Sequence, residues 1–441
     1  MNTKTLSTLA VAAAIALATA VWINTANAPI NEESAKDKPL LPGLRDDLNK
    51  VDAFTLSGAG GKALVTLKRS GEGWQVAERS GYAADIGKLR EYLYRLADAK
   101  VLDTKTASPK RYAELGVEDP IDPKAQSVLV ALGGLQGLPK LIVGLYNGQG
   151  GGGTFVRREG EAQSLLASGT LLADKDPAAW IRKDLIDIDA ARITQVTLTG
   201  ADGKTLRVYK EQPTDANFRI ADLPKGREPA SDFVANGMGS GLSNLRADDA
   251  AAAKDAPAPV EKCDQGRSLL DSRDQGGAQK CAFKARYLGF DGRVVEVTAW
   301  ETDGKARVQF AASNDAVQLD ADIAAAQASD KAAYETAVAA AKLKAVEAKG
   351  DDAATAKAEA DMAKPASLAD PAKDRTDRIA TANKAADDLN RKLQGWTYTV
   401  PQYAFQNFHK NIDELLKPVE TKAAAGVKGG KSAPPILPSK P

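Results

Sequence analysis

Residues 55–62 read TLSGAGGK, and residues 197–204 read TLTGADGK. The likeness extends outward, because VDAFTLSGAGGKALVTLK (51–68) and ITQVTLTGADGKTLRVYK (193–210) agree without gaps at eight positions. Both stretches alternate apolar and polar residues with a period of two, which is typical of half-buried β-strands. The sequence therefore predicts that each glycine-rich octapeptide is a hairpin turn between two strands.

Glycine-rich turns that end in lysine also occur in phosphate-binding loops. A loop of the Walker type needs Gly-Lys-Ser/Thr at the start of a helix, so that backbone N–H groups face the anion. Here Lys62 and Lys204 are followed by residues that alternate as strands do. We therefore interpret the glycines as turn residues with positive φ, and we interpret NGQGGGG (147–153) in the same way.

The same order of elements follows each pair of strands. A third strand is predicted at GWQVAE (73–78) and at NFRIAD (217–222). Apolar residues at helical spacing come next, and they are Ile86, Leu89, Leu93 and Leu96 in the first copy and Val234, Met238, Leu242 and Leu245 in the second. Three more strands are predicted after each helix: SVLVAL, LIVGLY and TFVRR, then KARYLGF, RVVEVTAWE and ARVQFAA. The prediction is an α+β tandem repeat of antiparallel strand meanders with packed helices, over residues 47–188 and 189–418.

Two segments fall outside this repeat. Residues 314–394 interrupt the second copy and are rich in Ala, Lys and Asp, a composition that favours helix. Apolar residues step by three and four along Ile379, Ala382, Ala386, Leu389 and Leu393, so we expect a helical hairpin that serves as an arm for a partner or is a solvated insertion. Residues 419–441 lack apolar periodicity, and we expect them to be disordered.

The N-terminus predicts contact with a membrane. Lys4 precedes the uncharged run Leu6–Ile23, which is about long enough to cross a bilayer. Residues 1–28 are therefore a retained anchor or a signal peptide cleaved after Ala26-Asn27-Ala28, followed by a linker over residues 29–46. Either fate places the body of the chain outside the cytoplasm, and the expected location is the periplasmic side of a bacterial inner membrane.

The chain has two cysteines, Cys263 and Cys281, which flank a polar, turn-rich stretch. In an oxidising compartment this arrangement favours a disulfide, which would stabilise the fold by roughly 3 kcal/mol. Two free thiols and half of a metal site are the alternatives. A metal site needs further ligands, and the sole histidine, His409, has no Cys or second His near it in the sequence.

Composition argues against several classes of function. Lys and Arg number 59 against 58 Asp and Glu, and aromatic residues make up 5% of the chain, so nucleic acid is not an expected partner. Serine or cysteine catalysis would have to use His409, which lies in the lysine-flanked stretch QNFHKN. We therefore expect no catalytic, cofactor-binding or metal-binding residues and no enzyme activity. A pair of carboxylates that cleaves glycosides is the remaining alternative, because the distance between two carboxylates depends on the fold.

Several motifs in order carry a family resemblance. GWQV, YAELGVEDP (112–120), LIVG and WIRKDLIDI (180–188) resemble the bacterial DUF4340 family over much of residues 50–250. Members of that family are often encoded beside ABC transporters of the gliding-motility type. The resemblance implies an accessory subunit that contacts a transporter permease or a second extracytoplasmic component, and it carries over no catalytic residues.

Two hypotheses follow. The first is a non-catalytic, membrane-anchored, extracytoplasmic subunit that acts by protein–protein interaction. The alternative is a periplasmic protein that binds or hydrolyses polysaccharide or cell wall in a groove between the two repeats. Carboxylates and aromatic platforms converging in one groove would favour the alternative.

Overall fold

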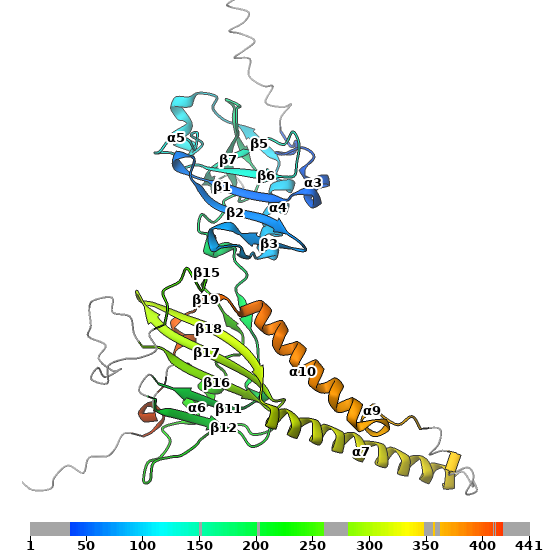
Figure 1. Ribbon diagram of the computed structural model, residues 1–441. Helices are drawn as coiled ribbons and strands as arrows, with labels where there is room; N and C mark the ends of the chain where they lie inside the picture. The colour runs from blue at the N-terminus through cyan, green and yellow to red at the C-terminus, as the bar shows by residue number, and fades with distance from the viewer. Residues whose placement is uncertain are drawn as a thin grey trace, which may run out of the picture. The chain divides into compact units, whose positions relative to one another are not determined.

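Figure 1 shows the computed structural model, which describes residues 36–149, 152–200, 203–259, 281–347, 356–357, 362–408, 410 and 412–417. The chain divides into two compact units. The first consists of residues 1–184 with Arg246–Ala258 and Gly395–Thr399, and the second of Leu185–Leu245, Pro259–Gln394 and residues 400–441. The described residues combine helices with antiparallel sheet, which confirms the predicted α+β class.

The first unit contains a sheet with the strand order β4-β3-β2-β1-β6-β7-β8-β9-β5. Its strands are β1 (Ala53–Ser57), β2 (Ala63–Ser70), β3 (Gly73–Val76), β4 (Tyr82–Ala83), β5 (Val101–Thr104), β6 (Val128–Gly133), β7 (Leu141–Asn147), β8 (Gly153–Arg158) and β9 (Ser164–Ala167). Its helices are α3 (Leu44–Asp47), α4 (Ile86–Asp98) and α5 (Tyr112–Leu115). All the strand pairs are antiparallel, as a series of meanders requires.

Burial in the first unit follows the sequence pattern. In β1 the buried residues alternate with half-buried ones, and Phe54 and Leu56 face the core. Helix α4 begins at the N-cap Asp85, whose carboxylate accepts a hydrogen bond from the Lys88 amide at 2.9 Å. The core side of α4 carries Leu89, Tyr92, Leu93 and Leu96, so the predicted helix is confirmed.

Aromatic rings form the centre of the first unit. The Phe54 ring lies 5.4 Å from that of Tyr92 and 5.0 Å from that of Trp180. The Tyr92 hydroxyl donates to the Leu171 carbonyl at 2.9 Å, and the Trp180 indole N–H donates to the Asp174 carbonyl at 2.9 Å. These bonds satisfy the polar atoms that the rings bring into the core.

Two strands from later in the chain also belong to the first unit. β15 (Asp249–Ala252) pairs with β19 (Trp396–Thr399). The ring of Tyr82 in β4 lies 4.8 Å from the Trp396 ring and 5.9 Å from that of Tyr398. The Arg79 guanidinium binds both carboxylate oxygens of Asp249, at 2.6 and 3.1 Å. This unit is therefore built from segments that are distant in sequence.

The second unit contains strands in the order β13-β12-β11-β16-β17-β18. They are β11 (Ile193–Thr199), β12 (Thr205–Tyr209), β13 (Arg219–Ile220), β16 (Phe283–Gly289), β17 (Arg293–Thr302) and β18 (Lys305–Asn314). Hairpin turns at Asp291-Gly292 and Asp303-Gly304 join the last three strands, with positive φ at Gly292, Asp303 and Gly304. The chain passes between the units through β10 (Asp184–Ile186) and β14 (Leu245–Arg246).

The helices of the second unit differ in length. They are α6 (Asp232–Gly239), α7 (Ala316–Glu347), α9 (Ala366–Ala369), α10 (Pro371–Leu393) and α11 (Gln402–Phe405). Helix α6 is shorter than the apolar spacing suggested, because Leu245 lies in β14. Met238, Leu242 and Leu245 are nevertheless all buried.

Some predicted segments lie outside the described residues. These are the leader over residues 1–28, residues 29–35 of the linker that follows it, and the tail over residues 419–441. In the part of the chain that the structure describes, no helix combines the length and the apolar character needed to cross a membrane. The N-terminal anchor therefore stays a prediction.

Candidate functional site

The two glycine-rich octapeptides are hairpin turns. β1 ends at Ser57 and β2 begins at Ala63, so the residue after Lys62 opens a strand. Gly60 and Gly61 have φ of 71° and 68°, a conformation that L-residues with a side chain rarely adopt. Their amides donate to the carbonyls of Asp122 and Pro120, at 3.2 and 2.9 Å. Because these donors are already used within the protein, the turn holds the LGVEDPIDP segment rather than presenting a phosphate cradle.

The second octapeptide closes with the same hydrogen bond as the first. The Gly58 amide donates to the Lys62 carbonyl at 2.9 Å, and the Gly200 amide donates to the Lys204 carbonyl at 2.9 Å. β12 begins at Thr205, directly after Lys204. Both motifs therefore connect two antiparallel strands and share this closing hydrogen bond, and residues 201–202 lie outside the described residues.

The predicted disulfide cannot be located in full, because Cys263 lies outside the described residues and Cys281 lies within them. His409 is also outside them. Among the residues that the structure does describe, no three His, Cys, Asp or Glu side chains gather as a metal site would require.

The most distinctive surface of the second unit is made by helices α7, α9 and α10, which we call the helical arm (Figure 1). Helix α7 has 32 residues, which corresponds to a length of about 48 Å. Of its described side chains, only Leu319, Ile323 and Val338 are buried. Val317, Leu343 and Val346 are 81%, 62% and 61% exposed, so apolar surface remains open on this helix.

The base of the helical arm is fixed to the sheet by asparagine side chains. The Asn390 amide group accepts from the Ala312 N–H at 2.7 Å and donates to the Ala312 carbonyl at 2.8 Å. Seven residues earlier on α10, the Asn383 side chain accepts a hydrogen bond from the Asn314 side chain at 2.9 Å. These contacts join α10 to the end of β18, along which the helix packs.

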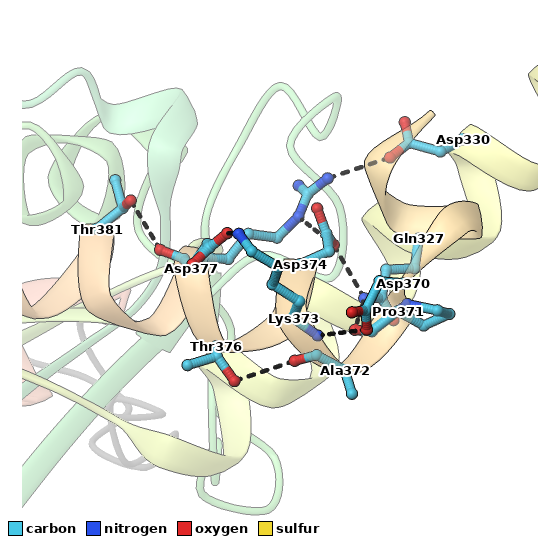
Figure 2. Close-up of polar contacts among 11 residues, drawn as sticks. Gln327, Asp330, Asp370, Pro371, Ala372, Lys373, Asp374, Thr376, Asp377 and Thr381 are labelled. Carbon is cyan, nitrogen blue, oxygen red and sulfur yellow. Dashed lines mark hydrogen bonds and ion pairs between the residues drawn. The ribbon is translucent and has the colours of Figure 1, made fainter. Parts of the chain in front are cut away.

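Polar contacts also connect the helices within the arm (Figure 2). The Arg378 guanidinium bonds to Asp374 at 2.8 Å and to Asp330 of α7 at 3.1 Å. The Gln327 side-chain amide donates to Asp374 at 2.9 Å and to the Pro371 carbonyl at 3.0 Å. A further ion pair joins Arg375 to Asp320 at 2.8 Å. Residues of α10 thus bind α7 at several successive points.

This network perturbs the ionisation of its members. The hydrogen bond from Gln327, and next the one from Arg378, lower the pKa of the Asp374 carboxyl. The bond to Asp374 in turn raises the pKa of Arg378. Both groups are therefore held in their charged forms, as a structural ion pair is, and neither is poised to exchange a proton near neutral pH.

A groove of about 310 Å³ lies at the base of the arm. Its lining includes Leu319, Ile323 and Ala382, together with the charged residues Asp322 and Arg378. Partial burial, followed by the neighbouring Asp291 carboxylate, raises the pKa of Asp322, while Arg378 opposes the shift. Asp291 is itself paired with Arg192 at 2.9 Å, and Asp377, which also lines the groove, is paired with Lys373 at 2.6 Å. Among the described lining residues, both other carboxylates are therefore already in ion pairs.

A second groove, of about 480 Å³, lies farther along the arm between α7 and α9. Tyr334, Val338 and Leu368 supply its apolar lining. Three of its four charged lining residues are lysines, namely Lys331, Lys342 and Lys364, and the fourth is Glu335. The lining therefore combines apolar and basic groups, and Lys331 lies 3.9 Å from the Glu335 carboxylate.

The fold and the arm define a class of protein: a two-unit α+β protein with antiparallel sheets and a long helical arm on its second unit. Residues 74–263 match the family model of a domain of unknown function, DUF4340. The family resemblance read from the sequence is thereby confirmed. The matched range runs from β3 to beyond β15, and the helical arm lies outside it.

Comparison with curated proteins and with solved structures produced no match.

Proposed function

We propose that this chain is a non-catalytic subunit that works by binding other proteins, and that the helical arm is its principal contact surface. The observation that carries the proposal is helix α7, which keeps most of its described side chains exposed although it spans 32 residues. A long helix with so little buried surface gains little stability from its own fold. Contact with a partner would bury Leu343 and Val346.

The construction of the arm supports this role. α10 is clamped to β18 through Asn390, and α7 is tied to α10 through Arg378 and Gln327. A surface held in this way loses little conformational entropy on binding, which favours affinity. The ion pairs lie between the helices, so the outer side of α7 is left for a partner.

We further propose that the two units derive from one duplicated module, with the arm as a helical hairpin inserted into the second copy. The strand order β3-β2-β1-β6-β7-β8 in the first unit has the same form as β13-β12-β11-β16-β17-β18 in the second. In each half of the chain a helix lies between the first group of strands and the last group, and β5 pairs with β9 as β15 pairs with β19. Residues 159–163 connect β8 to β9, whereas the arm lies between β18 and β19.

The proposed setting is the outer face of a bacterial inner membrane, with residues 1–28 as anchor and an ABC transporter permease or a second extracytoplasmic component as partner. Two features support this setting. The uncharged run Leu6–Ile23 has the length of a membrane span. The match of residues 74–263 to the DUF4340 model supports the family resemblance from which the transporter association is inferred.

Site-specific photocrosslinking from the arm tests the proposal. A photoreactive amino acid at Leu343, in the full-length chain in its native cells, is expected to crosslink to a transporter component. The same amino acid at Ile121, which is 77% exposed in the first unit, serves as the matched control and is expected to give no such adduct. Equal labelling from both positions, or none from Leu343, would refute a contact through the arm.

A further inference from the structure

The third strand of each unit has a different neighbour on its outer side. In the first unit β4 pairs with β3, with Ala83 opposite Gln75 and Tyr82 opposite Val76. In the second unit β13 ends the strand order, and among the described residues its single neighbouring strand is β12. Among the described residues, no strand therefore takes the place beside β13 that β4 takes beside β3.

This edge of β13 presents main-chain hydrogen-bonding groups. In an antiparallel pair, successive residues turn their N–H and C=O groups alternately toward and away from the partner strand. The Ala221 amide donates to the Arg207 carbonyl of β12 at 2.8 Å, so the N–H and C=O of the preceding residue, Ile220, point away from β12. The Phe218 amide also points outward, where the Asn236 side chain accepts its hydrogen bond at 2.9 Å.

A cavity of about 430 Å³ lies beside this edge. Ile220, Leu223 and Pro229 contribute apolar lining, and Phe233 nearby on α6 is 83% exposed. The charged lining residues are Asp215, Asp232 and Arg219. Arg219 is paired with Glu211 at 2.9 Å and also acts on the Asp215 carboxylate, so the lining carries one cation against two carboxylates.

Hydrogen bonds hold the two carboxylates of the cavity in place. Hydrogen bonds from the amides of Gln212 and Glu211 lower the pKa of Asp215. The Asp232 carboxylate accepts a bond from the Asn217 side chain at 2.9 Å, and Asn217 in turn accepts one from Asn236 at 2.8 Å. The side chains that surround the edge are thus already arranged in place.

We propose that the edge of β13 binds an extended segment of another protein, which adds as a strand at Ile220 and places a lysine or arginine beside Asp215 and Asp232. In strand addition, the main-chain hydrogen bonds provide affinity, and pockets for the side chains of the added strand provide specificity. The first unit shows the same edge filled by a strand, β4, and the acidic cavity selects a basic side chain. This surface is separate from the helical arm, so either proposal stands without the other.

Photocrosslinking from the edge tests the inference. A photoreactive amino acid at Leu223 is placed in the full-length chain in its native cells, and the adduct is mapped by mass spectrometry. The expected adduct joins position 223 to one defined segment, containing a lysine or arginine, of another protein. Exchange of the Ile220 amide, measured with that segment as a synthetic peptide, is expected to slow when the peptide is added.

Substitutions at the edge sharpen the test. Ile220→Pro removes the outward N–H and is expected to lower adduct yield about tenfold, whereas Ile220→Val keeps the N–H and leaves the yield unchanged. Asp232→Asn keeps the acceptor for Asn217 but removes the charge, so the yield falls about two- to fivefold. Far-ultraviolet circular dichroism and the melting temperature identify any variant that fails to fold.

Four outcomes would overturn the inference. They are no discrete adduct from position 223, an adduct with a second copy of this chain, an adduct with the tail of the same chain, and a yield that both Ile220→Pro and Asp232→Asn leave unchanged. A crosslink from Leu343 in the same cells would show that the arm contact survives such a failure.

Discussion

The side-chain amide of Asn390 pairs with both main-chain groups of Ala312, at 2.7 Å for the bond it accepts and 2.8 Å for the bond it donates. Asn390 thus acts toward the end of β18 as a residue of a neighbouring strand would. Because the contact fixes both the rotation and the position of α10, it determines where the helical arm leaves the sheet. The helical arm is therefore attached to the sheet of the second unit at a fixed position.

Replacing Asn390 with alanine is expected to destabilise the second unit by about 1–3 kcal/mol, because two half-buried hydrogen bonds are lost together. Urea unfolding followed by circular dichroism measures the change. Asp387→Ala, at an exposed position on the same helix, is the control and should change the free energy of unfolding by less than about 0.5 kcal/mol. A value for Asn390→Ala as small as the control would show that this clamp does not hold the arm.

The glycine-rich turns predict a stability effect without a binding effect. Gly60 has φ of 71° and open space where a Cβ would lie, so Gly60→Ala strains the backbone without a clash. We expect a loss of about 1–2 kcal/mol in the free energy of unfolding. Gly73→Ala, at a position without positive φ and with no close neighbour, is the control. Binding of a fluorescent nucleotide that Lys62→Ala removes would contradict the interpretation of this loop as a turn.

The contacts of Asp374 predict that acid loosens the arm (Figure 2). Its pKa is lower in the folded protein than in the unfolded chain, so the folded state favours the carboxylate. The stabilisation is therefore present above the unfolded pKa of about 3.9, and it is lost as the pH falls through the lowered folded value. Hydrogen exchange of α9 and α10, corrected for intrinsic rates, should quicken over this range.

Asp374→Asn supplies the matched comparison for that titration. The variant is expected to exchange faster than the native chain at pH 7, because the ion pair with Arg378 is already absent. It should also show a smaller additional change on acidification. An identical pH response in both proteins would assign the loosening to other carboxylates.

We predict a disulfide between Cys263, which lies outside the described residues, and Cys281, which lies within them. Peptide mapping without reductant is expected to recover residues 263 and 281 as one linked fragment. Replacing both with serine should lower the free energy of unfolding by roughly 3 kcal/mol, because a loop closed in the unfolded chain is opened. Recovery of two unlinked, alkylated cysteines would rule out the bond.

The local pattern of the sequence predicted the sheets well. The apolar alternation around the octapeptides placed β1, β2, β11 and β12, because a strand with one buried face must alternate. The stripe from Ile379 to Leu393 likewise identified the buried or half-buried side of α10. In both cases a strand or helix that buries one face repeats its apolar residues with a regular period, and this period can be recognised in a single sequence.

Other features depend on contacts that no local pattern reports. Leu242 and Leu245 continue a helical spacing, yet α6 ends at Gly239 and Leu245 lies in β14. Both residues are buried. Their spacing therefore predicted their burial correctly but not their secondary structure. The stripe on α10 predicted a helical hairpin, whereas α10 packs along β18 as well as against α7.

The arm contacts were missed for a similar reason. Asn383 and Asn390 lie seven residues apart on α10, so they share a face of the helix. Two asparagines at that spacing beside an apolar stripe were the sequence signal that could have indicated a polar contact on this face of the helix. Their partners, Asn314 and Ala312, could be known only once the fold had brought β18 alongside.

The composition of the complex recovered from native membranes tests the central claim most directly. The full-length chain, released with a mild detergent, is expected to co-elute with a transporter permease or a second extracytoplasmic component, and Leu343→Glu with Val346→Glu is expected to abolish that co-elution while the melting temperature stays unchanged. Elution of the native chain by itself, or undiminished recovery of the partner with the double variant, would contradict the claim that the arm binds it.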